Sequence, residues 1–122
     1  MDRQTVFRYV KRQYGTEPDY PWEDDNAVLR HKGNKKWYAA LLKVDRKKLG
    51  LGGVGTVDVI NVKCEPMLIG SLRTQPGFFP AYHMNKDKWI SILLDDTVSA
   101  EETRNLIDMS YELTKPKERR PR

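Results

Sequence analysis

The chain has 122 residues, a net charge of +5 and a single cysteine, Cys64. A chain of this length is expected to form one domain around one hydrophobic core. One cysteine excludes an internal disulfide, and no Cys/His cluster indicates a zinc site. No apolar segment is long enough for a signal peptide or a membrane span, so we expect a cytoplasmic protein with no membrane partner.

The positive charge is concentrated at the C-terminal end. Residues 115–122 contain five basic residues and one acid, a net charge of +4, so residues 1–114 carry only +1. The end of the chain also has few apolar groups to offset the entropy of ordering it. We therefore predict a single domain over residues 1–114 and a disordered basic tail over residues 115–122.

The first elements are predicted from capping residues and apolar spacing. Apolar residues recur every three to four positions over residues 3–14, with Asp2 placed to cap the start of a helix and Gly15 to end it. The β-rich segments 27–31 and 35–44 flank the turn-forming tripeptide Lys-Gly-Asn, which predicts a hairpin.

The next segment, GLGGVG at residues 50–55, matches the spacing GxGxxG of dinucleotide-binding loops. That function requires a helix after the glycines, because the phosphates bind at the helix N-terminus. Residues 56–64, TVDVINVKC, are instead typical of a β-strand. We therefore interpret the glycine-rich segment as a hairpin loop.

The elements of the second half of the chain are predicted from the same kinds of signal. Pro66 is placed at the start of a short helix that ends at Pro76-Gly77, and residues 80–84 and 89–95 predict a second hairpin around the turn NKDK. A helix capped by Ser99 completes the chain. The order α-β-β-β-α-β-β-α indicates an α+β fold, an antiparallel sheet of about five strands with helices packed on one face.

Several stretches together resemble one family. They are DYPWEDDNAVLRHKGNKKWYAAL, INVKCEP, PGFFPAYHMNKDKWISILLDDTVSAEE and LIDMSYELT. They are similar to the MmcQ/YjbR family of small bacterial cytoplasmic proteins, whose fold resembles that of CyaY, the bacterial frataxin. The resemblance implies a protein of unknown function with no cofactor, in a family often described as DNA-binding. It does not imply iron binding, because the first helix here is basic and lacks an acidic ridge.

The best functional candidate in the residues themselves is the basic first hairpin, a two-stranded ribbon of the kind that contacts nucleic-acid phosphates, with Trp37 and Tyr38 available for stacking on bases. We predict weak, non-enzymatic DNA or other nucleic-acid binding here, although a charged face that only confers solubility has the same composition. His31 is expected to face solvent or to form part of the same positive surface. The candidate residues are Arg30, Lys32, Lys35, Lys36, Trp37, Lys43, Arg46, Lys47 and Lys48.

The alternative is a binding surface for a small anionic ligand or a protein partner around the turn before residue 89. Its candidates are Tyr82, His83, Asn85, Lys86 and Trp89. The same residues are also explained as a well-packed turn, with Asn85 providing turn geometry and Trp89 packing.

No catalytic or metal site is predicted, because no nucleophile adjoins His83 and no carboxylate pair or hydrolase motif is present. Cys64, at the end of a predicted strand, is expected to be buried and structural. We therefore expect a protein that is not an enzyme, and a monomer is favoured.

Overall fold

The computed structural model describes residues 1–116. It contains three α-helices, a short 3-10 helix and five strands, an α+β fold in the predicted order. The elements are α1 (Arg3–Tyr14), β1 (Ala27–Arg30), β2 (Trp37–Asp45), η1 (Arg46–Leu49), β3 (Thr56–Lys63), α2 (Pro66–Leu72), β4 (Phe78–Pro80), β5 (Trp89–Leu93) and α3 (Ala100–Thr114).

The five strands form one antiparallel sheet in the order β1-β2-β3-β5-β4. Because alternate side chains of a strand point to opposite faces, the apolar residues divide into two clusters. Leu41, Ile60 and Ile92 belong to the main core, whereas Leu42 and Val59 belong to a second cluster on the other face. Both faces of the sheet are therefore apolar.

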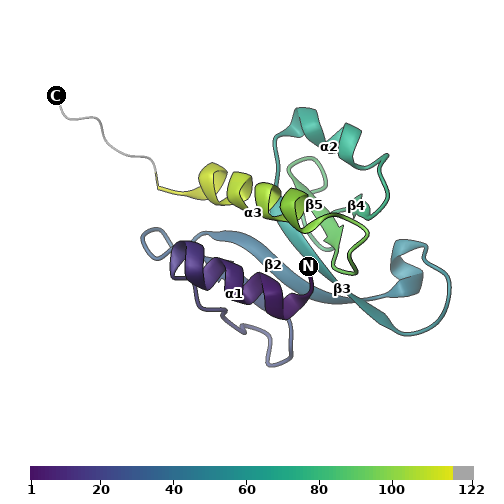
Figure 1. Cartoon of the computed structure of the whole chain (residues 1–122), viewed down its shortest axis with the longest axis horizontal. Helices are drawn as coiled ribbons and strands as arrows, with labels where there is room; N and C mark the ends of the chain where they lie inside the picture. The colour runs from purple at the N-terminus through teal and green to yellow at the C-terminus, as the bar shows by residue number, and fades with distance from the viewer. Residues whose placement is uncertain (117–122) are drawn as a thin grey trace.

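Helices α1 and α3 lie side by side over one face of the sheet, and α2 lies near its β4 end (Figure 1). The hydroxyl groups of Tyr9 and Tyr14 on α1 both donate to the carboxylate of Asp108 on α3. The rings of Tyr14 and Tyr111 stack with their centroids 3.7 Å apart. The two helices thus form one covering layer, which we call the helical face of the sheet. The opposite side is the open face.

Most of the local predictions are confirmed. The Asp2 carboxylate accepts a hydrogen bond from Thr5 N at 2.8 Å, and Gly15 ends α1 in the left-handed conformation with φ 68°. The hydroxyl of Ser99 accepts from Glu102 N at 3.1 Å. Local hydrogen bonding was enough to place these helix ends.

The strand predicted at residues 80–84 is wrong in position. Strand β4 covers Phe78–Pro80, and the chain then turns, with His83 in the left-handed region at φ 58°. A positive φ is incompatible with an extended strand. The backbone of residue 82 is held by side chains from the sheet rather than by a continued strand ladder, as described below.

The glycine-rich segment is confirmed as a loop between two strands. It follows η1 and leads into β3, so no helix N-terminus is present to bind a phosphate. Arg46 Nε donates to Gly52 O at 2.5 Å, which braces the loop. The segment therefore has no dinucleotide-binding geometry.

Within the described residues, no helix has the length and apolar character needed to cross a membrane. The predicted disordered tail, residues 115–122, lies largely outside the described part of the chain, which ends at residue 116.

Candidate functional site

The nine predicted nucleic-acid-binding residues fall into two groups at opposite ends of β2. Strand β2 is nine residues long. At a rise of about 3.4 Å per residue, this separates its ends by roughly 27 Å. One group, at the hairpin turn, comprises Arg30, Lys32, Lys35, Lys36 and Trp37, and the other comprises Lys43, Arg46, Lys47 and Lys48. The sequence's single basic stripe is thus two separate surfaces.

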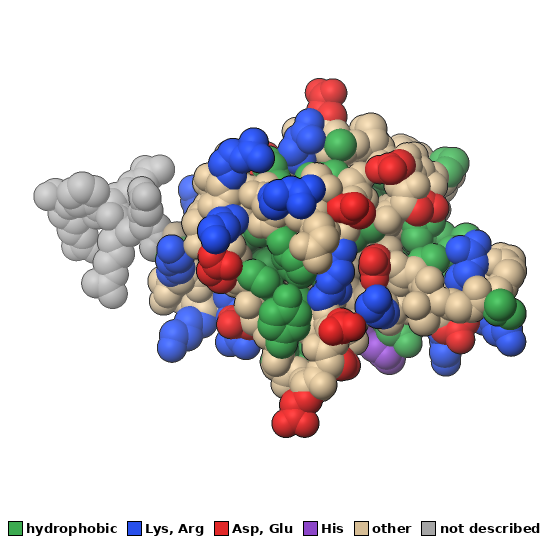
Figure 2. Space-filling model, turned by 60° about the horizontal axis from the view of Figure 1, so that its bottom comes forward, with side chains coloured by type: hydrophobic (Ala, Val, Ile, Leu, Met, Phe, Trp, Pro, Cys, Tyr) green, Lys and Arg blue, Asp and Glu red, His purple; other side chains and the backbone are tan. Residues whose placement is uncertain are grey.

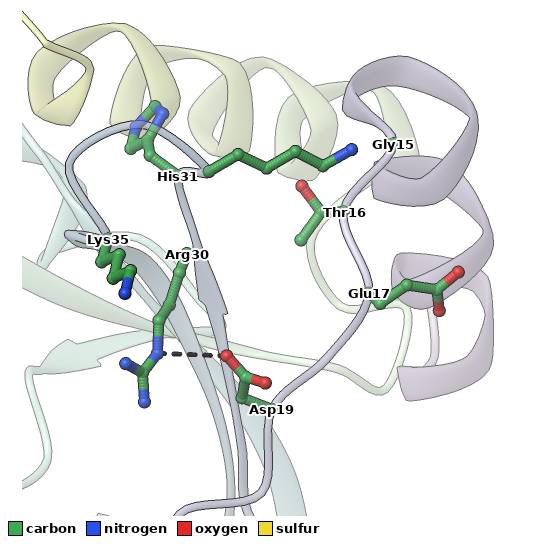
Figure 3. A pocket seen from close by; sticks show the side chains of 8 residues that line it. Gly15, Thr16, Glu17, Asp19, Arg30, His31 and Lys35 are labelled. Carbon is green, nitrogen blue, oxygen red and sulfur yellow. Dashed lines mark ion pairs between the residues drawn. The ribbon is translucent and has the colours of Figure 1, made fainter.

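The group at the turn borders the first of two candidate sites, a hollow of about 510 Å³ that we call the hairpin-end pocket (Figure 3). It lies where the C-terminal end of α1 meets the β1–β2 turn. Its polar lining consists of Thr16, Glu17, Asp19, Arg30, His31, Lys32 and Lys35.

Some charged side chains of this pocket are ion-paired, and others are not. Arg30 Nε lies 3.2 Å from Asp19 Oδ2, and Glu17 is paired with Lys11 at 3.1 Å. Lys32 and Lys35 are exposed and form no ion pair with any residue between 1 and 116. The pocket therefore offers two unpaired ammonium groups beside a guanidinium that is ion-paired with Asp19.

His31 is not a surface residue, which corrects the prediction for it. Its side chain is buried, with Nε2 2.8 Å from Thr114 Oγ1 at the end of α3. Its ring lies 4.2 Å from the ring of Tyr111, centroid to centroid. Burial lowers the pKa of His31, so the ring is neutral at pH 7 and adds no charge to the pocket. It joins the hairpin to the helical layer.

The two aromatic residues predicted to stack on bases have different positions. Tyr38 is fully buried and donates to Thr16 Oγ1 at 2.8 Å, so it is a core residue and cannot contact a base. Trp37 is half-buried and packs edge-on against Trp22, with ring centroids 5.5 Å apart. Trp22 is 44% exposed. Sequence reasoning missed Trp22, because nothing local places it beside the hairpin.

The second candidate site lies on the open face, beside the turn at residues 81–88. We call it the turn pocket, a hollow of about 250 Å³. It is lined by Lys48, Leu49, Phe79, Pro80, Ala81, Tyr82 and Lys86. Only Tyr82 and Lys86 of the five predicted ligand-surface residues line it. The structure adds Lys48, from the far group of basic residues.

The other three predicted residues shape the turn. Asn85 Oδ1 accepts from Asp87 N at 2.9 Å, and Asn85 O accepts from Trp89 N at 2.9 Å. Trp89 begins β5, and the ring of His83 lies 4.0 Å from that of Tyr82. Asn85 thus has the turn-forming role that its residue type suggests.

A buried polar pair on the open face holds this turn in place. Asn61 on β3 and Ser91 on β5 are paired in register and fully buried. Asn61 Nδ2 donates to Tyr82 O at 2.8 Å, Tyr82 N donates to Ser91 Oγ at 3.0 Å, and Ser91 Oγ donates to Asn61 Oδ1. The sequence does contain a signal for this pair. Strand alternation places both polar residues on a face that is otherwise apolar.

Cys64 and the residue types that bind metals were also located in the structure. Cys64 is buried as predicted, and burial raises the pKa of its thiol, which keeps it protonated at neutral pH. Residues 1–116 contain no group of three His, Cys, Asp or Glu side chains suited to a metal ion.

With this geometry in hand, comparison with known proteins identifies the family. The family model described as YjbR matches residues 11–113. The chain belongs to the YjbR family. It is 47% identical over 117 residues to the uncharacterized protein YyaQ of Bacillus subtilis (strain 168), covering 94% of this chain and 99% of that protein.

Solved structures of similar proteins share the fold. A crystal structure of a Pseudomonas syringae protein has a TM-score of 0.92 and 48% identity, covering 94% of this chain and all of that one. A solution NMR structure from the same organism has a TM-score of 0.87 and 46% identity over 99% and 98% of the two chains. Deinococcus radiodurans protein DR2400, 24% identical with a TM-score of 0.70 over 93% of this chain and 78% of its own, shows the fold alone.

Proposed function

We propose that this YjbR-family protein is a non-enzymatic, low-affinity nucleic-acid-binding protein that contacts its ligand at the hairpin-end pocket. The observation that carries the proposal is the pair of unpaired ammonium groups, Lys32 and Lys35, beside the Arg30 guanidinium. Lys36 follows in the same turn and is exposed. Together they are suited to phosphate groups, whose neutralisation dominates nucleic-acid affinity.

The exposed tryptophan favours a single strand over a duplex. Trp22 presents part of its ring to solvent and is supported by Trp37, at the start of the strand that follows this basic turn. Aromatic rings stack on unpaired bases, which are not accessible in a duplex. Figure 2 shows Lys and Arg side chains on this face of the molecule, with Asp and Glu side chains among them.

The test is fluorescence-anisotropy binding of the full chain to a labelled single strand at low and moderate salt. We expect the Lys32→Gln/Lys35→Gln variant to bind about tenfold more weakly, with a salt slope smaller by about 1.4, since each phosphate contact on a single strand contributes about 0.7. The matched control is Lys43→Gln/Lys47→Gln, which removes the same charge at the other end of β2 and should change affinity less than about threefold. Equal losses in the two variants would show only a general charge effect.

Two further arms separate the contributions. Trp22→Ala should weaken single-strand binding about tenfold and leave duplex binding unchanged, because stacking contributes about 1–3 kcal/mol per base. Binding by a chain that ends at Pro116 measures how much the basic residues that follow contribute to the affinity. Binding that does not depend on salt, or that disappears with those residues, contradicts the proposed site.

A second candidate function is a binding module for a small anionic ligand or a protein partner at the turn pocket. The buried Asn61–Ser91 pair favours it, because these two polar side chains in the sheet interior bind the backbone of Tyr82, which lines the pocket. Burying polar groups is unfavourable unless they are hydrogen-bonded, and here their partners are each other and that turn. Lys86→Gln should then abolish partner binding without lowering stability, which differential scanning calorimetry of the variant checks.

A further inference from the structure

The turn pocket combines apolar walls with two cations from distant parts of the chain. Leu49, Phe79 and Tyr82 are half-buried and pack against the second apolar cluster, so their remaining exposed surface faces the hollow. Its volume, about 250 Å³, is just below the range of roughly 300–1,000 Å³ typical of drug-sized ligand sites. A ligand with a single ring matches that size.

The two lysines of the pocket lack counter-charges. Lys48 in η1 and Lys86 in the turn are both exposed, and neither forms an ion pair with a residue in the described range 1–116. Among residues 1–116, no acidic side chain lines the hollow. Its electrostatic complement is therefore an anion, and its apolar walls favour one with a hydrophobic body.

The geometry of the wall is set before any ligand binds. The backbone N–H and C=O of Tyr82 are both bound by buried side chains of the sheet, and His83 beside it is held at a positive φ. Left-handed backbone at a residue other than glycine persists only where the surrounding structure imposes it. A wall positioned in this way loses little entropy on binding.

We propose that the turn pocket binds a small aromatic carboxylate, with the ring against Phe79 and Tyr82 and the carboxylate between Lys48 and Lys86. Aromatic side chains favour offset or edge-on contact with a ligand ring. The ammonium groups supply charge-assisted hydrogen bonds to the carboxylate. This inference rests on the second candidate function, names its ligand class, and is independent of nucleic-acid binding at the hairpin end.

The probe is phenylacetate, titrated into the ¹⁵N-labelled full chain and followed by heteronuclear NMR. We expect saturable shifts of the Leu49, Ala81 and Tyr82 amides, with a dissociation constant of about 1 mM for so small a ligand. Phenylacetamide, which keeps the ring and removes the charge, should bind about fivefold more weakly.

A matched pair of variants tests the two cations. Lys48→Gln/Lys86→Gln should reduce phenylacetate affinity to that of phenylacetamide. Lys47→Gln/Lys88→Gln changes the exposed neighbours in the same two segments, neither of which lines the pocket, and should leave affinity within about twofold. Equal binding of the acid and the amide, or equal loss in both variants, overturns the proposal.

Two more probes show whether only the proposed ligand class is wrong or whether the turn pocket binds no anionic ligand at all. Inorganic phosphate supplies charge without a ring, and a hexaglutamate peptide represents an acidic protein segment. If either shifts the amides of the pocket and phenylacetate does not, the ligand class is wrong and the binding function stands. If none of the three shifts them, both the inference and the second candidate function are overturned.

Discussion

The two faces of the sheet are both apolar but are covered in different ways. The helical face lies under α1 and α3, which are joined through Asp108 and stacked tyrosine rings. The open face is packed against loop and turn residues such as Leu51 and Tyr82, and it contains the buried polar pair Asn61 and Ser91. One face is thus covered by helices that contact each other through polar and aromatic side chains, and the other is covered by loop and turn residues that border the turn pocket.

The largest expected difference in stability between the two faces is tested by two neighbouring leucines of β2. Leu41 is fully buried under the helices, and Leu42 points to the open face and is 8% exposed. We expect Leu41→Ala to lower the free energy of unfolding by about 4 kcal/mol and Leu42→Ala by about 2 kcal/mol, because loops collapse into a cavity more readily than packed helices. Urea unfolding of both variants measures the difference. A larger loss for Leu42→Ala would reverse the assignment of the two faces.

The next largest effect on the free energy of unfolding is expected from Asn61 and Ser91, the polar pair of the open face. Asn61→Ala leaves the carbonyl of Tyr82 without its buried partner, so we expect a loss of about 2 kcal/mol. Ser91→Ala should cost a similar amount, and the double variant less than the sum by about 1 kcal/mol, since both members belong to one network. Urea unfolding provides the double-mutant cycle. Strict additivity would mean that the pair does not act as a unit.

A smaller, pH-dependent effect on stability is expected from His31, under the helical layer. Burial lowers the pKa of His31 below its usual 6.5. The unfolded chain therefore takes up a proton at higher pH than the folded chain does. Stability is fully present above about pH 6.5 and falls as the pH decreases from there towards 5. In His31→Gln, which has no group titrating in this range at that position, urea unfolding should show less change between pH 7 and 5. An unchanged slope would exclude His31 as its source.

The smallest effect is expected in alkali, from the tyrosines that bind Asp108. Burial and the neighbouring carboxylate raise the pKa of Tyr9 to about 12, and the same causes raise that of Tyr14. Both hydroxyls stay protonated in the folded protein where the unfolded chain already ionises, so stability decreases as the pH rises above about 10. Tyr9→Phe should lose less stability between pH 9 and 11, as measured by thermal unfolding. An identical loss would mean that Tyr9 is not perturbed.

The order of elements and most of their ends followed from local sequence. Asp2, Gly15 and Ser99 act on hydrogen bonds within their own turn, and strand alternation depends only on neighbouring residues. The family was also recognisable, because its motifs are continuous stretches of the chain. The shift of β4 to Phe78–Pro80 was not predictable, since the backbone of residue 82 is bound by side chains of Asn61 and Ser91.

The candidate sites depended still more on the tertiary structure. The sequence by itself determined that basic residues crowd positions 30–48 and that one turn holds His83, Asn85 and Lys86. Only the fold decided that β2 separates the basic residues into two groups, that His31 is buried against Thr114, and that Lys48 and Lys86 line the same hollow. The physical reason is that caps and strand alternation arise from interactions between residues close in sequence, whereas a pocket is formed where segments distant in sequence pack together.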